Sequence, residues 1–382
     1  MVMSRIETDT VFVRRDFLEP EAPPASLGGF PGWARKHLFS SPLNILVTLA
    51  MALLLVWAGP PLFRWLFVDA VWTGTNRDAC LPKNGEPMGA CWAFVHAKLA
   101  QFTFGSYPAD QRWRPSLVMI GFFLGLAWIA IPKMPRRREG TWLMLTAFPV
   151  LTFWLLYGGF GLPIVETPNW GGLLVTLVVA ITGIVASLPL GILLALGRRS
   201  KLPFIKIVSV VFIEIWRGVP LITVLFMASV MLPLFLPNGV NFDKLLRALI
   251  GVALFTGAYM AETIRGGLQA IPKGQYEGAA SLGLSYWQSM RLIILPQALK
   301  IVIPGIVNSF ISLFKDTSLV MIIGLYDLLG SIQRNFSDAS WSTPSIAPTG
   351  LIFAAAVFWV FCFSMSRYSM YMERKLNTGR KR

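Results

Sequence analysis

Long apolar runs constrain this chain more than any other feature of its sequence. A helix needs about 20 mainly apolar residues to cross a hydrocarbon core of about 30 Å. Of the 382 residues, 55% are hydrophobic and only 14% are charged, a balance outside the range of soluble domains. We therefore predict an all-α polytopic membrane protein with eight transmembrane helices, at residues 43–63, 115–131, 142–162, 171–196, 207–232, 248–268, 301–325 and 350–366.

Several classes of chemistry are excluded by residues that the chain lacks. Its only histidines are His37 and His96, both outside the predicted helices, so neither an HExxH metal site nor an intramembrane Ser/His pair can form. No Gly-Lys dipeptide occurs, which excludes a GxxxxGK[ST] phosphate loop. We expect no catalytic, cofactor-binding or metal-binding residues here, and any ATP that drives transport must bind to another subunit.

The basic excess indicates the orientation of the chain. Thirty-four Lys and Arg against 19 Asp and Glu give a net charge of +15, which could suggest nucleic acid. Basic residues also accumulate in cytoplasmic loops of membrane proteins. Most fall inside if both termini are cytoplasmic, so we predict no nucleic-acid partner, a cytoplasmic segment at 1–42, a periplasmic loop at 64–114 and a basic tail at 374–382. The charged residues before the first apolar run favour an anchor over a cleaved signal peptide.

The predicted outer loop contains two of the three cysteines, Cys80 and Cys91. In an oxidising periplasm they could form a disulfide that closes a short loop. Separation along the chain does not establish geometry, so the sequence leaves a bonded and an unbonded pair as equal alternatives.

Polar and charged side chains inside a transmembrane helix cost free energy when they contact lipid, so they normally face protein or water. Glu214 and Arg217 are three residues apart, as are Glu262 and Arg265, so each pair can meet on one helix face. Pro220 follows the first pair closely enough to break that helix. Two interpretations stay open for the whole set, namely structural ion pairs or the lining of a pathway for a zwitterionic solute. The set comprises Glu214, Arg217, Glu262, Arg265, Asn308, Lys315 and Asp316.

Residues 265–300 form the most distinctive connection between two predicted helices. Pro272 favours a helix start, Gly283 a helix end, and Ser285 with Gln288 a capping box, so we predict two short helices. Small residues beside one acid would suit a groove on a partner protein, whereas the alternative is an ordinary amphipathic helix pair at the membrane surface. The residues that define this pattern are Glu277, Gly278, Ala279, Gly283, Ile293, Leu295 and Pro296.

That pattern resembles the EAA-x3-G-x9-I-x-LP motif of the membrane subunits of bacterial ABC importers. Gly278 departs from it, because the motif has alanine there. The runs at 215–221, 261–272 and 315–319 resemble the polar amino acid branch of the family, although Val219 replaces its usual threonine or serine. The resemblance covers about residues 171–373, and the whole chain is similar to the M-type permease of the general L-amino acid uptake system.

The resemblance implies a five-helix type I importer (MetI-like) permease core at 171–373, preceded by three extra helices at 43–170. It implies that the EAA loop at 265–300 couples alternating access to two ATPase subunits, which hold ATP and Mg. A sister permease in a heterodimer and a periplasmic amino acid binding protein would complete a bacterial inner-membrane importer of L-amino acids. The alternatives are a secondary transporter driven by an ion gradient and a non-transporting membrane scaffold.

Overall fold

The computed structural model describes residues 29–82, 87–235, 237 and 242–376. It divides into two compact units, Met1–Val68 and Asp69–Arg382. The predictions for residues 1–28 and for the end of the tail at 377–382 lie outside the described residues.

The first unit contains an apolar helix that is long enough to cross a membrane. It comprises α1 (Gly29–His37), α2 (Pro42–Phe63) and a π-helical turn at Arg64–Val68. Ser41 caps α2 by accepting a hydrogen bond from the backbone N–H of Asn44 (3.2 Å). This helix confirms the first predicted span, 43–63, almost to the residue.

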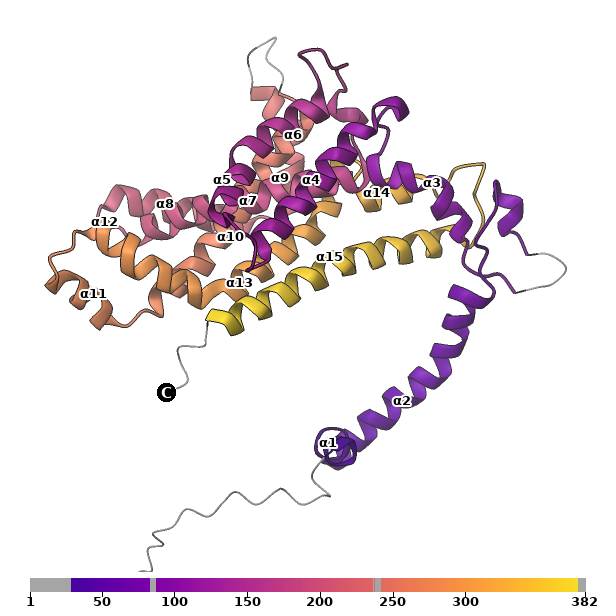
Figure 1. Ribbon diagram of the computed structural model, residues 1–382, viewed down its shortest axis with the longest axis horizontal. Coiled ribbons are helices and arrows are strands. Elements are labelled where there is room, and N and C mark those ends of the chain that lie inside the picture. Colours follow the sequence, from indigo (N-terminus) through magenta and orange to yellow (C-terminus); the bar gives the residue numbers. More distant parts are fainter. Residues whose placement is uncertain (1–28, 83–86, 236, 238–241, 377–382) are drawn as a thin grey trace, which may run out of the picture. The chain divides into compact units, whose positions relative to one another are not determined.

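The second unit is helical, and its described residues contain isolated β-bridges in place of strands (Figure 1). Six helices of the described chain are long and apolar enough to cross a membrane, or eight if each of two bent pairs is one span. The helices of the second unit are α3 (Trp92–Phe104), α4 (Trp113–Ala130), α5 (Arg137–Leu145), α6 (Ala147–Tyr157), α7 (Gly172–Arg198), α8 (Pro203–Gly218), α9 (Leu221–Phe226), α10 (Lys244–Gln269), α11 (Lys273–Ser281), α12 (Tyr286–Ser289), α13 (Leu295–Asp316), α14 (Leu328–Arg334) and α15 (Ile346–Leu376).

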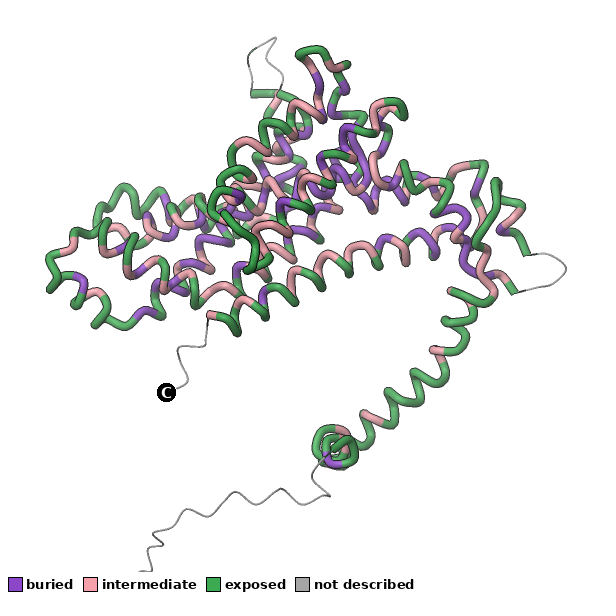
Figure 2. Tube along the Cα trace, in the orientation of Figure 1, coloured by how far each residue is buried: buried purple, intermediate pink, exposed green. Residues whose placement is uncertain are grey.

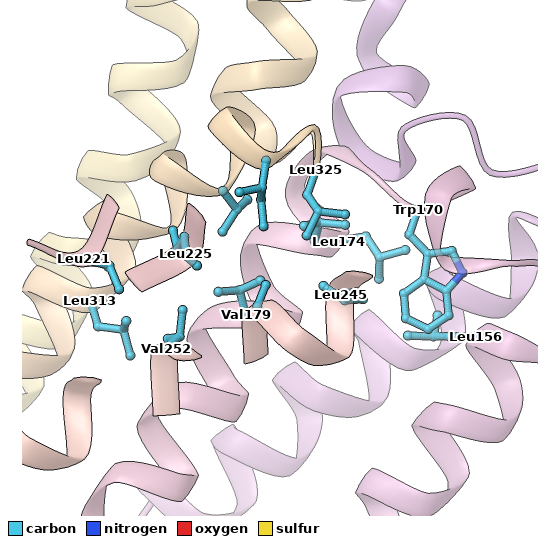
Figure 3. Close-up of a cluster of buried hydrophobic side chains, with 14 of the residues drawn as sticks. Leu156, Trp170, Leu174, Val179, Leu221, Leu225, Leu245, Val252, Leu313 and Leu325 are labelled. Carbon is cyan, nitrogen blue, oxygen red and sulfur yellow. The ribbon is translucent and has the colours of Figure 1, made fainter. Parts of the chain in front are cut away.

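Helices α7, α10 and α13 form the centre of the second unit, and α15 packs along α13 (Figure 1). Buried residues concentrate on α7 and α10 (Figure 2). Close packing depends on glycine, because a Cβ on Gly191 of α7 would lie 2.6 Å from the side chain of Met260 on α10. Figure 3 shows the largest apolar cluster, in which Val179, Leu225 and Val252 join α7, α9 and α10.

The two bent pairs have local causes in the sequence. The α8–α9 pair bends by 102°, because Val219 and Pro220 adopt extended backbone and end the hydrogen-bonded ladder. The prediction that Pro220 breaks this helix is therefore confirmed. The α5–α6 pair bends by 43° at Thr146.

Residues 69–82 and 87–107 fold against α14 and the start of α15. The structure contains the Cys80–Cys91 disulfide, with Cα atoms 5.7 Å apart. The ring of Phe94 on α3 packs 6.0 Å from that of Trp341, and Lys98 pairs with Asp338 at 2.5 Å. The hydrogen bond from Lys98 lowers the pKa of the Asp338 carboxyl. What we predicted only as a loop at 64–114 therefore contains a helix, because α3 buries an apolar side that we did not identify.

Candidate functional site

The segment at 265–300 contains the helix and capping signals that we predicted from the sequence. Helix α11 follows Pro272, and Gly283 adopts a left-handed conformation (φ 71°) just beyond its end. Ser285 and Gln288 form the complete capping box that we predicted. The prediction of a short second helix was wrong, because α12 continues through a π-helical turn at Met290–Ile294 into α13. Pro296 does not break this run, since it lies in the first turn of α13.

The seven motif residues of this segment do not share one environment. Glu277, Gly278, Gly283 and Pro296 are exposed. Ile293 and Leu295 are partly buried, and Ala279 is buried against its own chain. Only the exposed members are available to a partner, so the motif combines surface residues with residues that hold the segment together.

Exposed apolar side chains on the same segment were missed in the sequence. Leu282 is 75% exposed and Trp287 is 68% exposed, and Tyr286 and Leu292 are also exposed. The signal was available, because a connector between helices that lies only in water rarely carries four large apolar side chains. Exposed apolar side chains in such number are typical of a segment that contacts a partner protein or a membrane surface.

An apolar cluster fastens this segment to the helical bundle. Met290 and Ile294 pack with Ile264 and Leu268 of α10. The amide of Gln297 on α13 donates a hydrogen bond to the side-chain oxygen of Gln275 on α11 (2.9 Å). The segment is therefore joined to the ends of two central helices, α10 and α13.

Beyond the segment, charged side chains join the ends of α7, α8 and α10. Glu262 is the centre, with its carboxylate 2.8 Å from Arg198 and from Arg265, and 3.9 Å from Arg217. Arg198 also pairs with Glu214 at 2.8 Å. The predicted pair of Glu262 and Arg265 is confirmed, whereas that of Glu214 and Arg217 is wrong. These two side chains turn to α7 and α10, where each finds an opposite charge that was invisible in the local sequence.

Arg198 was missed as a member of this network. It stands in the last turn of α7, just beyond the helix predicted at 171–196. Three guanidinium groups surround two carboxylates, so the network retains one positive charge in excess. Such a site favours carboxylate groups and disfavours cations.

A cavity of about 340 Å³ lies between α10 and α13. Two predicted polar residues, Asn308 and Asp316, line it, whereas Lys315 does not. Lys315 is exposed on another part of α13, as expected for adjacent helical residues. Sequence reasoning missed the remaining lining side chains, which are Phe255, Thr256, Tyr259, Ser309, Ser312 and Leu313.

Tyr259 connects this cavity with the charge network. Its hydroxyl lies 3.4 Å from the backbone carbonyl oxygen of Arg217, and the guanidinium of Arg217 lies 5.5 Å from its ring centre. Because Arg217 also faces Glu262, one side chain contacts both the lining of the cavity and the centre of the network. Arg217 therefore connects the lining of the cavity with the charge network.

The protein family and the individual proteins that are similar to this chain agree with one another. Residues 187–378 match the family model of the binding-protein-dependent transport system inner membrane component. The inner membrane amino-acid ABC transporter permease protein YhdY of Escherichia coli is 53% identical over 349 residues, which are 91% of this chain and 93% of that protein. The glutamate/glutamine/aspartate/asparagine transport system permease protein BztC of Rhodobacter capsulatus is 43% identical over 97% of this chain and 99% of its own length.

A crystal structure of an amino acid ABC transporter with histidines is 31% identical and covers 53% of this chain and 92% of its own, with a TM-score of 0.47. The family match and the two long relatives agree with the resemblance in the sequence. The chain therefore belongs to the amino-acid ABC transporter permeases of the binding-protein-dependent family, multi-pass inner-membrane subunits that work with a separate ATPase and a binding protein.

Proposed function

We propose that this permease moves polar L-amino acids from the periplasm to the cytoplasm by alternating access. The observation that carries the proposal is the cavity between α10 and α13. Its volume of about 340 Å³ lies in the range of about 300–1,000 Å³ of small-molecule sites. Amide, hydroxyl and carboxylate groups line one part, and Phe255 and Leu313 line another.

The lining matches the chemistry of an amino acid. The Asp316 carboxylate would take the α-ammonium group, because opposite charges bind strongly where water is scarce. The amide of Asn308 and the hydroxyl of Ser312 would donate to the α-carboxylate or to a polar side chain, and the hydroxyl oxygen of Ser309, which donates to the carbonyl of Gly305, would accept. The excess positive charge at the network beyond Tyr259 would favour acidic amino acids over basic ones. The relative from Rhodobacter capsulatus is named for glutamate, glutamine, aspartate and asparagine, and we extend that substrate class to this chain.

Coupling to ATP hydrolysis takes place in this proposal at residues 265–300. The exposed Glu277, Gly278, Gly283 and Pro296 would contact the ATPase, and Ala279, Ile293 and Leu295 would hold the contact surface in shape. Leu282 and Trp287 extend that surface. Binding of ATP and Mg belongs to the partner, and this chain has no nucleotide-binding site of its own.

The proposed assembly contains a sister permease as the second half of a heterodimer, two ATPase subunits and a periplasmic amino acid binding protein. Both termini of this chain face the cytoplasm, which puts the 265–300 segment on the side of the ATPase. The five-helix core spans 171–373, and the three helices at 43–170 are an addition to it. The comparisons give no support to a secondary transporter without an ATPase.

Uptake by the assembled transporter in proteoliposomes tests the proposal. Asp316→Asn should lower uptake of glutamine and glutamate about 10- to 100-fold, as expected for a lost charge-assisted hydrogen bond of about 1.5–3 kcal/mol. Lys315→Gln is the matched control, because Lys315 is adjacent but lies outside the cavity lining. Equal uptake by wild type and Asp316→Asn, or an equal loss in both variants, would contradict the assignment of the cavity.

A further inference from the structure

Arg199 links three helices at the base of the proposed coupling segment. Its guanidinium donates hydrogen bonds to the backbone carbonyl oxygen of Leu268 (2.9 Å) and to the hydroxyl oxygen of Tyr276 (3.1 Å). The Tyr276 hydroxyl in turn donates to the same carbonyl oxygen (3.1 Å). Arg199 follows α7, Leu268 lies near the end of α10 and Tyr276 is on α11. The three groups form a closed triangle, which we call the Arg199 triangle.

The surroundings of the Arg199 triangle make it more than one contact among many. A cavity of about 390 Å³ lies beside it, lined by both side chains of the triangle together with Gln269, Lys273 and Glu277. The hollow leaves one side of this part of α11 uncovered, and the polar bonds of the triangle supplement the apolar packing of Tyr276 on the other side. The guanidinium also lies 5.6 Å from the centre of the Tyr276 ring, which adds a cation–π contact.

Arg199 and its neighbour Arg198 bind different parts of the protein. Arg198 pairs with Glu214 and Glu262 in the charge network, whereas Arg199 bonds to Tyr276 on α11. The end of α7 therefore joins the coupling helix to the network that lies next to the amino acid cavity. Tyr276 directly precedes Glu277, so a force on the exposed carboxylate would reach the triangle through one peptide unit.

We infer that Arg199 and Tyr276 are positioning residues that transmit the movement of α11 to the ends of α7 and α10, and thereby couple ATP hydrolysis to transport. This inference rests on the proposed function of the 265–300 segment. The segment contacts the ATPase with its exposed surface, and the triangle connects its buried side to the gating helices. Loss of the triangle leaves the docking surface intact and lets α11 move over its cavity without carrying α7 along.

The test measures the amount of amino acid transported per ATP hydrolysed by the full complex in proteoliposomes. Tyr276→Phe removes one hydroxyl and keeps the ring, and Arg199→Gln removes the charge. Both should keep ATPase association and ATP hydrolysis near wild type. Transport per ATP should fall roughly tenfold, which corresponds to about 1.4 kcal/mol of lost coupling. Arg199→Lys should recover part of that loss, because a lysine keeps the charge but not the forked donor geometry.

Tyr371→Phe and Arg374→Gln are matched controls on exposed residues near the end of α15, outside the coupling segment, and should leave transport per ATP unchanged. Wild-type transport per ATP in both triangle variants would overturn the inference. Release of the ATPase from either inserted variant would also overturn it, because the residue would then belong to the docking contact. Failure of the wild-type chain itself to bind an ATPase would instead contradict the proposed function.

Discussion

Replacing Glu262 with glutamine removes the central negative charge from the network that joins α7, α8 and α10. Its carboxylate accepts close contacts from Arg198 and Arg265, both at 2.8 Å, and only 14% of its side chain is exposed. A hydrogen bond with a charged partner contributes about 1.5–3 kcal/mol. Two such contacts, taken at the lower figure because the arginines are partly solvated, predict a loss of about 3 kcal/mol in the free energy of unfolding.

Unfolding of the purified chain by SDS in mixed micelles measures this free energy. Glu139→Gln is the control, since Glu139 pairs with Arg136 at 3.9 Å with more than two-thirds of its side chain exposed. That variant should lose less than about 1 kcal/mol. A double-mutant cycle with Arg198→Gln and Glu262→Gln should give a coupling energy of about 1.5 kcal/mol. A loss in Glu262→Gln no larger than in Glu139→Gln, or a coupling energy near zero, would show that the ion pairs of Glu262 do not stabilise the fold.

Two further stability measurements test individual positions in the same micelles. Gly278→Ala should stabilise the chain by about 0.5–1 kcal/mol, because a Cβ there meets no atom within 4 Å, and a variant less stable than wild type would contradict this. Burial raises the pKa of the Asp327 carboxyl to about 6, so the folded chain keeps a proton that the unfolded chain releases above about pH 4. The free energy of unfolding should therefore fall by about 3 kcal/mol between about pH 4 and pH 6. Asp327→Asn should remove this pH dependence. The same pH dependence in wild type and Asp327→Asn would contradict the assignment.

Residue periodicity and helix signals in the sequence were enough to predict much of the helical architecture. Apolar runs identified α2, α4, α7 and α10 within a few residues, because a lipid solvent imposes a minimum length on each. The run at 350–366 identified α15, but this helix continues ten residues farther, to Leu376. The capping box at Ser285 and the break at Pro220 were also predictable, since each depends only on neighbouring residues. Local chemistry was therefore a sufficient guide wherever the partner lay within one helical turn.

Contacts between distant segments were not predictable in this way. Arg114 is the last residue of the predicted outer loop at 64–114, yet it is fully buried and donates to the backbone carbonyl oxygens of Leu155 and Pro163. Glu214 was paired with Arg217 on its own helix, but it bonds to Arg198 on α7. In each case the partner is supplied by the packing of another helix, which spacing along one helix does not show.

The residues of the candidate site differ in the same way in how far they could be predicted from the sequence. The 265–300 motif was visible because its residues are close together in sequence, whereas the cavity combines α10 with α13 and only Asn308 and Asp316 had been identified. Thr256 and Tyr259 carry no charge and occur in an apolar run, so nothing local distinguished them from packing residues.

Affinity purification of the tagged chain from its native membrane, together with an uptake assay, tests whether residues 265–300 couple transport to a separate ATPase. Gly283 has a φ of 71°, and a Cβ there meets no atom within 4 Å. Asparagine tolerates this conformation, whereas arginine adds bulk and charge at the proposed contact. We expect Gly283→Asn to retain both ATPase association and amino acid uptake. We expect Gly283→Arg to insert into the membrane but to lose both. A Gly283→Arg chain that still binds the ATPase and transports, or a wild-type chain that carries amino acids without any ATPase, would contradict this coupling.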